Sequence, residues 1–141
     1  MSEKEWLQRA WNIENEIREL EERRNRTRDD ALRITPSYES RESQSTFSGN
    51  SNEAKLISLA EYNLRIDEQI NKLYSVKKEI DLTIEAVPDA KLKRLLKLRY
   101  IDFKTWEKIA EHLDFADVRW VYVLHGRALK EVRKILSNSS L

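Results

Sequence analysis

The fold of this chain is decided by residues 105–136, TWEKIAEHLDFADVRWVYVLHGRALKEVRKIL. Thr105 and Asp117 each stand directly before an apolar run of helical spacing, and threonine and aspartate are common helix N-caps. The residues between the two runs, at 114–116, predict a turn. We therefore expect a short helix over 106–113, a tight turn and a final helix that begins at Asp117. Together these elements form a helix-turn-helix.

The final helix, which we expect to continue to about Leu136, divides into two faces. Its apolar stripe comprises Val121, Leu124, Ala128, Val132 and Ile135. The residues largely outside that stripe are Arg119, Val123, Arg127, Lys130, Arg133 and Lys134. A helix that enters the major groove of DNA needs this division, because one face packs on its own domain while the other meets the nucleic acid. The alternative is an ordinary three-helix bundle with a basic exterior.

One more helix is expected before the helix-turn-helix. Pro88 ends the helix that precedes it, because proline cannot continue a helix. Asp89 is then predicted as the N-cap of a helix through about Tyr100. The inward-facing residues of that helix are Leu92, Leu95 and Leu96. Residues 88–141 are thus predicted to form one domain.

Composition favours the same fold class. Glycine and proline occur twice each among 141 residues, and 36% of the residues are charged. So few turn formers leave little room for β-hairpins, and a chain rich in Glu, Lys, Arg and Leu is typical of long helices. The fold class is therefore predicted to be all-α.

The net charge of +1 conceals an uneven distribution along the chain. Residues 1–33 carry a balance of −1, residues 34–87 carry −3, and residues 88–141 carry +5. A positive domain of this kind favours a polyanion as its partner.

The first 87 residues predict two amphipathic helices joined by a linker. Residues 1–33 carry apolar residues at alternating spacings of four and three, which is the pattern of a coiled-coil seam. Residues 34–52 are rich in serine and predict a flexible linker. Residues 53–87 predict a long helix with the same kind of seam. Its stripe comprises Leu56, Leu59, Ile66, Ile70, Leu73, Ile80, Ile84 and Val87.

These two helices can bury their stripes in two ways. They either fold back on each other as an antiparallel hairpin or pair with the helices of a second copy, and we expect a homodimer through them. Asn63 and Lys77 interrupt the stripe of the second helix. These polar residues either set the register of the pairing or lie at its edge.

The chain also resembles a known family in residues 95–113, LLKLRYIDFKTWEKIAEHL, and 121–136, VYVLHGRALKEVRKIL. Both stretches resemble region 4 of the sigma-70 family, the part that reads the −35 promoter element. More closely, nearly all of residues 1–136 is similar to small sigma-like regulators encoded by phages and prophages of Gram-positive bacteria. That family is grouped loosely with late-transcription regulators of the RinA and ArpU type. The resemblance implies double-stranded DNA and host RNA polymerase as partners.

Three positions depart from expectation for such a domain. The stretch between Ala110 and Val121 is one residue longer than usual, which leaves the rotational setting of 118–120 open by one position. Asp114 occupies the turn position where glycine is usual, so we expect a positive φ there. Gly126 lies inside the final helix, where glycine is unfavourable, and close approach of another helix would account for it.

The predicted DNA-contacting residues fall into two groups. The first two turns of the final helix present Arg119, Trp120, Tyr122, Val123 and Arg127, with Arg119 and Val123 nearest the base edges. The residues expected to meet phosphates are Arg127, Lys130, Arg99, Lys104 and Thr105.

Other functional classes are not indicated. Cysteine is absent, which excludes disulfides and thiol catalysis, and the two histidines, His112 and His125, lie on different predicted helices. We therefore expect no catalytic residue, no cofactor and no metal. The sequence has neither a signal peptide nor an apolar run of membrane-spanning length, so we expect a cytoplasmic protein without membrane contact.

The predicted function is that of a DNA-binding transcriptional regulator. Nothing in the chain resembles the sigma region that melts promoter DNA, so an activator or a polymerase-associated factor is expected rather than a complete sigma factor. Two alternatives stay open. One is a small terminase subunit that binds DNA for genome packaging, and the other is a module that docks its basic face on an acidic protein.

Overall fold

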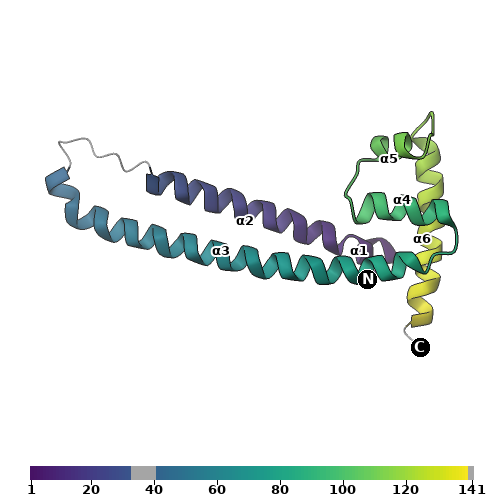
Figure 1. Ribbon diagram of the computed structural model, residues 1–141, viewed down its shortest axis with the longest axis horizontal. Coiled ribbons are helices and arrows are strands. Elements are labelled where there is room, and N and C mark those ends of the chain that lie inside the picture. The colour runs from purple at the N-terminus through teal and green to yellow at the C-terminus, as the bar shows by residue number, and fades with distance from the viewer. Residues whose placement is uncertain (33–40, 140–141) are drawn as a thin grey trace. The chain divides into compact units, whose positions relative to one another are not determined.

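The computed structural model describes the backbone of residues 1–32 and 41–139, and the side chains of 1–32 and 52–139. Six helices make up this part of the chain (Figure 1). They are α1 (Glu3–Leu7), α2 (Arg9–Leu32), α3 (Arg41–Glu85), α4 (Ala90–Tyr100), α5 (Trp106–His112) and α6 (Arg119–Ser139). The described residues contain no strand, which confirms the predicted all-α class. None of the described helices is both long and apolar enough to cross a bilayer.

The start of α3 differs from the prediction. The helix begins at Arg41, whereas the Ser-rich composition placed its start near Asn52. The remainder of the predicted linker, 34–40, lies outside the described residues. A helix extends readily once it is nucleated, because each added residue gains a hydrogen bond. No proline follows Pro36 until Pro88, so nothing in the backbone of 41–51 stops that extension.

The chain divides into two compact units. The first, which we call the head unit, comprises residues 1–13 and 73–141, and the second, the shaft unit, comprises residues 14–72. The head unit therefore includes α1 and the last part of α3 in addition to the predicted domain 88–141. The prediction placed both of these segments outside the domain.

Side-chain caps set the helix boundaries of the head unit. The carboxylate of Asp89 accepts hydrogen bonds from the backbone N–H groups of Lys91 and Leu92 at 2.9 and 3.0 Å. The hydroxyl of Thr105 accepts one from the N–H of Lys108 at 3.2 Å. Both predicted N-caps are thereby confirmed. These bonds satisfy N–H groups that have no partner within the helix.

The core of the head unit lies where α4, α5 and α6 meet. Its buried members are Leu95, Ile109, Ala110, Leu113 and Val121, and Leu98, Trp106, Phe115 and Leu124 pack against them. Phe115 comes from the turn between α5 and α6, so this ring closes the core at the point where the chain reverses. The packing holds α5 and α6 at a fixed angle and leaves one face of α6 outside.

Two further segments complete this core. Leu7 of α1, Ala10 of α2, Ile80 and Ile84 near the end of α3, and Val87 just after α3 are fully buried. The short helix α1 packs against α6. Arg9 forms an ion pair with Glu79 at 3.3 Å, which ties the start of α2 to α3.

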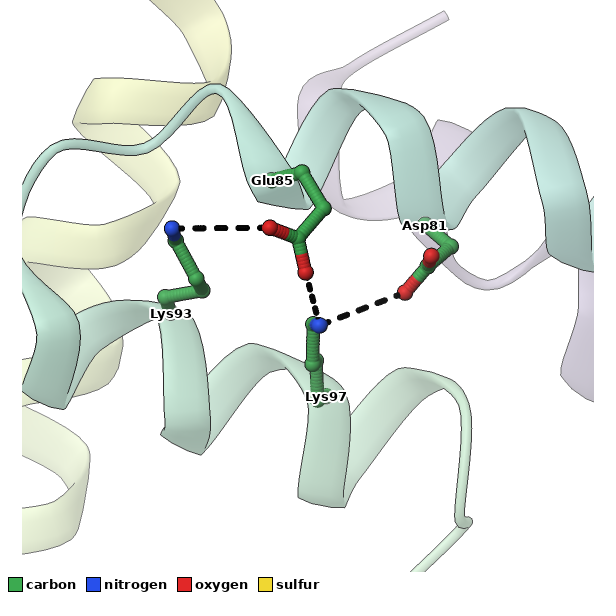
Figure 2. Close-up of polar contacts among 4 residues, drawn as sticks. All are labelled: Asp81, Glu85, Lys93 and Lys97. Carbon is green, nitrogen blue, oxygen red and sulfur yellow. Dashed lines mark hydrogen bonds and ion pairs between the residues drawn. The ribbon is translucent and has the colours of Figure 1, made fainter.

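Charged side chains join α3 to α4 across Pro88 (Figure 2). Lys97 of α4 contacts both Asp81 and Glu85 of α3, and Lys93 lies 3.6 Å from Glu85. The hydrogen bond from Lys97 lowers the pKa of the Glu85 carboxyl. Single exposed ion pairs contribute little to stability, but a network that shares partners restrains the angle between two helices.

In the shaft unit, α2 and α3 contact each other. The guanidinium of Arg24 donates to the side-chain carbonyl of Asn63 at 3.3 Å, and Ile17, Leu20 and Ile66 are buried. Asn63 therefore bonds across the pair. Leu56, which the predicted stripe placed inside, is 62% exposed. The helical phase of α3 turns this residue outward, because it lies ten residues before Ile66 and that separation does not return to the same face.

Candidate nucleic-acid interface

Helix α6 presents one exposed face and one buried face. Up to Lys134 its exposed residues are Arg119, Trp120, Tyr122, Val123, Gly126, Arg127, Lys130, Arg133 and Lys134. Its buried residues are Val121, His125, Ala128 and Val132. Five of the exposed residues are cationic, and Glu131 is the single acidic residue of the helix. The structure thus confirms the predicted division of α6 into an apolar and a basic face.

The first residue of α6 is held by the turn before it. The carboxylate of Asp117 accepts a hydrogen bond from the backbone N–H of Arg119 at 2.9 Å, where the sequence predicted the start of the helix. The same carboxylate accepts a bond from the Arg119 side chain, Nε to Oδ2, at 2.8 Å. These two bonds lower the pKa of Asp117. The Nη2 atom of Arg119 also lies 2.7 Å from Oδ2 of Asp117, and the Arg119 side chain nevertheless stays 85% exposed.

Three predicted residues meet at one hollow on the surface. Arg119, Trp120 and Val123 line a hollow of about 280 Å³ at the start of α6. The ring of Trp120 is 60% exposed and Val123 is 46% exposed. The longer turn therefore leaves both Arg119 and Trp120 on the solvent side of the helix, and neither is turned into the core.

Tyr122 lies at the edge of this face. Its ring contacts Trp106 of α5 edge-on, with 5.4 Å between ring centroids, and the residue is 48% exposed. Tyr122 therefore presents part of its surface to solvent and packs α6 against α5 with the rest.

The three phosphate-contacting residues predicted outside α6 are Arg99, Lys104 and Thr105, and their surroundings differ. Lys104 and Thr105 are exposed, although the Thr105 hydroxyl already caps α5. Arg99 is half-buried, and its guanidinium lies 4.1 Å from the centroid of the Trp106 ring. The same guanidinium donates to the carbonyl of Lys104 at 2.9 Å. Arg99 of α4 thus contacts both the loop before α5 and the first residue of α5. Its position in the sequence did not indicate this structural role.

A buried polar pair, His125 and Tyr100, joins α6 to α4. The sequence did not predict this pair. The Nε2 atom of His125 lies 2.6 Å from the hydroxyl of Tyr100 on α4, and the imidazole packs edge-on against Trp106 at 4.7 Å. Burial lowers the pKa of His125 to about 4 and raises that of Tyr100 to about 12. Part of this lowering at His125 comes from the positive charges of Lys4 and Arg99. His125 is therefore neutral at pH 7 and links α6 to α4 and α5.

Known proteins give no further guide to this surface. Comparisons with models of protein families, with curated proteins and with solved structures gave no match. Within the described part of the chain, no three histidine or carboxylate side chains gather as metal ligands would. The exposed face of α6 is therefore the feature from which a function is inferred.

Proposed function

We propose that this chain is a DNA-binding transcriptional regulator and that α6 is its recognition helix. The observation that carries the proposal is the exposed face of α6, where five cationic residues flank exposed Trp120 and Val123 while the opposite face is buried. A helix held on a rigid core with such a face fits the major groove of duplex DNA. The charge balance of +5 over residues 88–141 favours the same kind of partner.

The start of α6 supplies the base contacts in this proposal. Arg119 suits a bidentate contact to guanine, and the methyl groups of Val123 suit contact with thymine, each worth about 1–3 kcal/mol of discrimination. Trp120 shares the hollow with both residues and makes apolar contact beside them. Asp117 holds the Arg119 guanidinium in place before DNA binds, so less side-chain freedom is lost on binding.

Phosphate contacts come from the flanks of the same face. Arg127 and Lys130 lie two or more turns along α6, and Lys104 and Thr105 lie at the start of α5. Arg99 takes a supporting place in this proposal, because its guanidinium already contacts Trp106 and the carbonyl of Lys104.

The regulatory part of the proposal is supported by the resemblance to sigma region 4 and to phage-encoded regulators. In it, the head unit binds a promoter-proximal site, host RNA polymerase is the second partner, and two copies associate through α2 and α3. Light scattering tests the assembly, since a monomer or dimer fits a regulator. A ring of eight or more copies would instead favour the packaging alternative.

The first prediction separates base contacts from phosphate contacts. Genomic fragments of the source organism and its prophages, bound at low salt and footprinted, are expected to yield a protected site. Arg119→Ala should then weaken binding to that site about tenfold or more and leave binding to unrelated DNA nearly unchanged. Arg127→Ala should weaken binding to both and reduce the salt slope by about one.

A matched charge-loss control is Arg65→Ala, since Arg65 is an exposed arginine of α3 in the shaft unit. It is expected to bind both DNAs like the wild type. The absence of any protected site at low salt would overturn the proposed function. If Arg119→Ala and Trp120→Ala both left site selectivity unchanged, the placement of α6 in the groove would be wrong.

A further inference from the structure

Gly126 has no explanation within the chain itself. It lies inside α6, where glycine is less favourable than any residue except proline. Its φ is negative, so no special backbone conformation requires it. Apart from its chain neighbours and the backbone of its own helix, a Cβ atom built on Gly126 meets no heavy atom of the described residues within 4 Å. The close helix that the sequence led us to expect is therefore not there.

Gly126 lies on the solvent-exposed face of α6. Arg119 and Arg133 lie seven residues before and after it, which is nearly two full turns, so the three residues share one line along the helix. Lys130 lies about one turn after Gly126, and Val123 lies just under one turn before it. All of these neighbours are exposed. The missing side chain thus lies in the middle of the cationic face.

The charge around this point favours a negatively charged partner. Helix neighbours of Gly126 on the exposed side are Tyr122, a valine, arginines and a lysine, and the acidic Glu131 lies toward the other side and is half-buried. A polyanion that lies across the helix at the glycine would meet Lys130, one turn further along, and Arg127 on the same side of it. The distance along the helix axis from Arg119 to Gly126 is about 10 Å. That length is close to the width of the DNA major groove, about 12 Å.

We propose that one sugar–phosphate strand of DNA lies directly against the backbone of α6 at Gly126, beside Arg127 and Lys130. This inference rests on the proposed function and adds a contact site to it. With Arg119 at the base edges, the helix reaches the wall of the groove about two turns later, at Gly126. A Cβ atom there would stand between the helix and the strand, whereas glycine lets the two backbones meet.

The test measures stability and DNA affinity of the same full-length variants, Gly126→Ala and Gly126→Leu. Both should raise the Tm, by roughly 4 °C for alanine, because the helix gains a better helix former and no side chain is displaced. Both should also weaken binding to the footprinted duplex and to a mixed-sequence duplex, by about fivefold or more for leucine. A more stable protein that binds less well is a result that misfolding cannot produce.

Ala60→Leu is the matched control, because Ala60 is an exposed alanine of α3 in the shaft unit and leucine adds similar bulk there. It should leave affinity for both duplexes unchanged. If Gly126→Leu bound both duplexes as tightly as the wild type while Arg127→Ala weakened both, the strand contact would be wrong and DNA binding would stand. If the wild type bound neither duplex at low salt but bound an acidic protein, DNA binding and this contact would both be overturned.

Discussion

His125 is a buried ionisable side chain of the head unit, and its lowered pKa makes the head unit sensitive to pH. The imidazole is 8% exposed and hydrogen-bonded to Tyr100, so the folded protein keeps it neutral. Neighbouring Lys4 and Arg99 oppose a further positive charge. A protonated His125 would have no acceptor atom left on its ring and would carry a charge into the core.

We therefore expect stability to fall as the pH drops below about 6.5. Above that pH the imidazole is neutral in both states, and the stability is complete. Between 6.5 and about 4 the unfolded chain binds a proton that the folded chain does not. The free energy of unfolding should fall by up to about 3 kcal/mol over this window. Urea denaturation at pH 7, 6 and 5 measures the slope before most carboxylates titrate.

Two glutamine variants separate this effect from other histidine titrations. His125→Gln cannot titrate, so its stability should change much less between pH 7 and 5 than that of the wild type. His112→Gln removes an exposed histidine of α5 and should keep the wild-type slope. Equal slopes for all three proteins would show that His125 does not control the acid sensitivity.

At the scale of elements, the turn between α5 and α6 ends the first helix with a residue in the left-handed region. Asp114 has φ 59°, as the missing glycine led us to expect. The N–H of Phe115 bonds to the carbonyl of Ala110 at 2.9 Å, and the N–H of Asp114 bonds to that of Glu111 at 3.2 Å. This pair of bonds is a Schellman motif, in which the left-handed position usually holds glycine.

Asp114→Gly should therefore stabilise the protein. A residue with a Cβ is strained in this conformation and glycine is not, so we expect the free energy of unfolding to rise by about 0.5–1 kcal/mol. Asp114 is exposed, and its side chain takes little packing with it when it is removed. The midpoint of urea denaturation measures the change.

Phe103→Gly is the informative comparison, because Phe103 has φ 56° and a similar strain. Its ring, however, packs edge-on against Trp11 at 5.2 Å and lies under Lys77 at 4.7 Å. Loss of these contacts should outweigh the relief of strain and lower stability by about 1–3 kcal/mol. If Asp114→Gly also lowered stability, strain at the turn would not be the controlling factor.

At the scale of the whole molecule, the head unit is assembled from both ends of the chain. Leu7 is fully buried and belongs to α1, which packs on α6. Leu7→Ala should lower the free energy of unfolding by about 2–5 kcal/mol, because it leaves a cavity far along the sequence from the helix-turn-helix. Urea denaturation followed by the fluorescence of the tryptophans would measure it.

Leu32→Ala is the control with the same chemical change, because Leu32 is 73% exposed at the end of α2. Its effect should stay within about 0.5 kcal/mol. If Leu7→Ala were as mild as Leu32→Ala, α1 would not belong to the core. The predicted domain 88–141 would then be sufficient by itself.

Local physical chemistry explains what could be predicted from the sequence. The all-α class, the caps at Asp89 and Thr105, the positive φ of Asp114 and the basic face of α6 all depend on residues within a few positions of each other. Helical spacing and capping act over one or two turns, so they can be predicted from the sequence without knowledge of the tertiary neighbours.

Tertiary structure alone decided the features that join distant segments. His125 pairs with Tyr100, the half-buried Arg99 stacks on Trp106, and α1 packs against α6. The sequence also offered no way to know that Gly126 faces open space and not another helix. In each case the deciding quantity is a distance between side chains whose positions along the chain do not set it, because packing in three dimensions determines which groups are buried and which stay free to meet a partner.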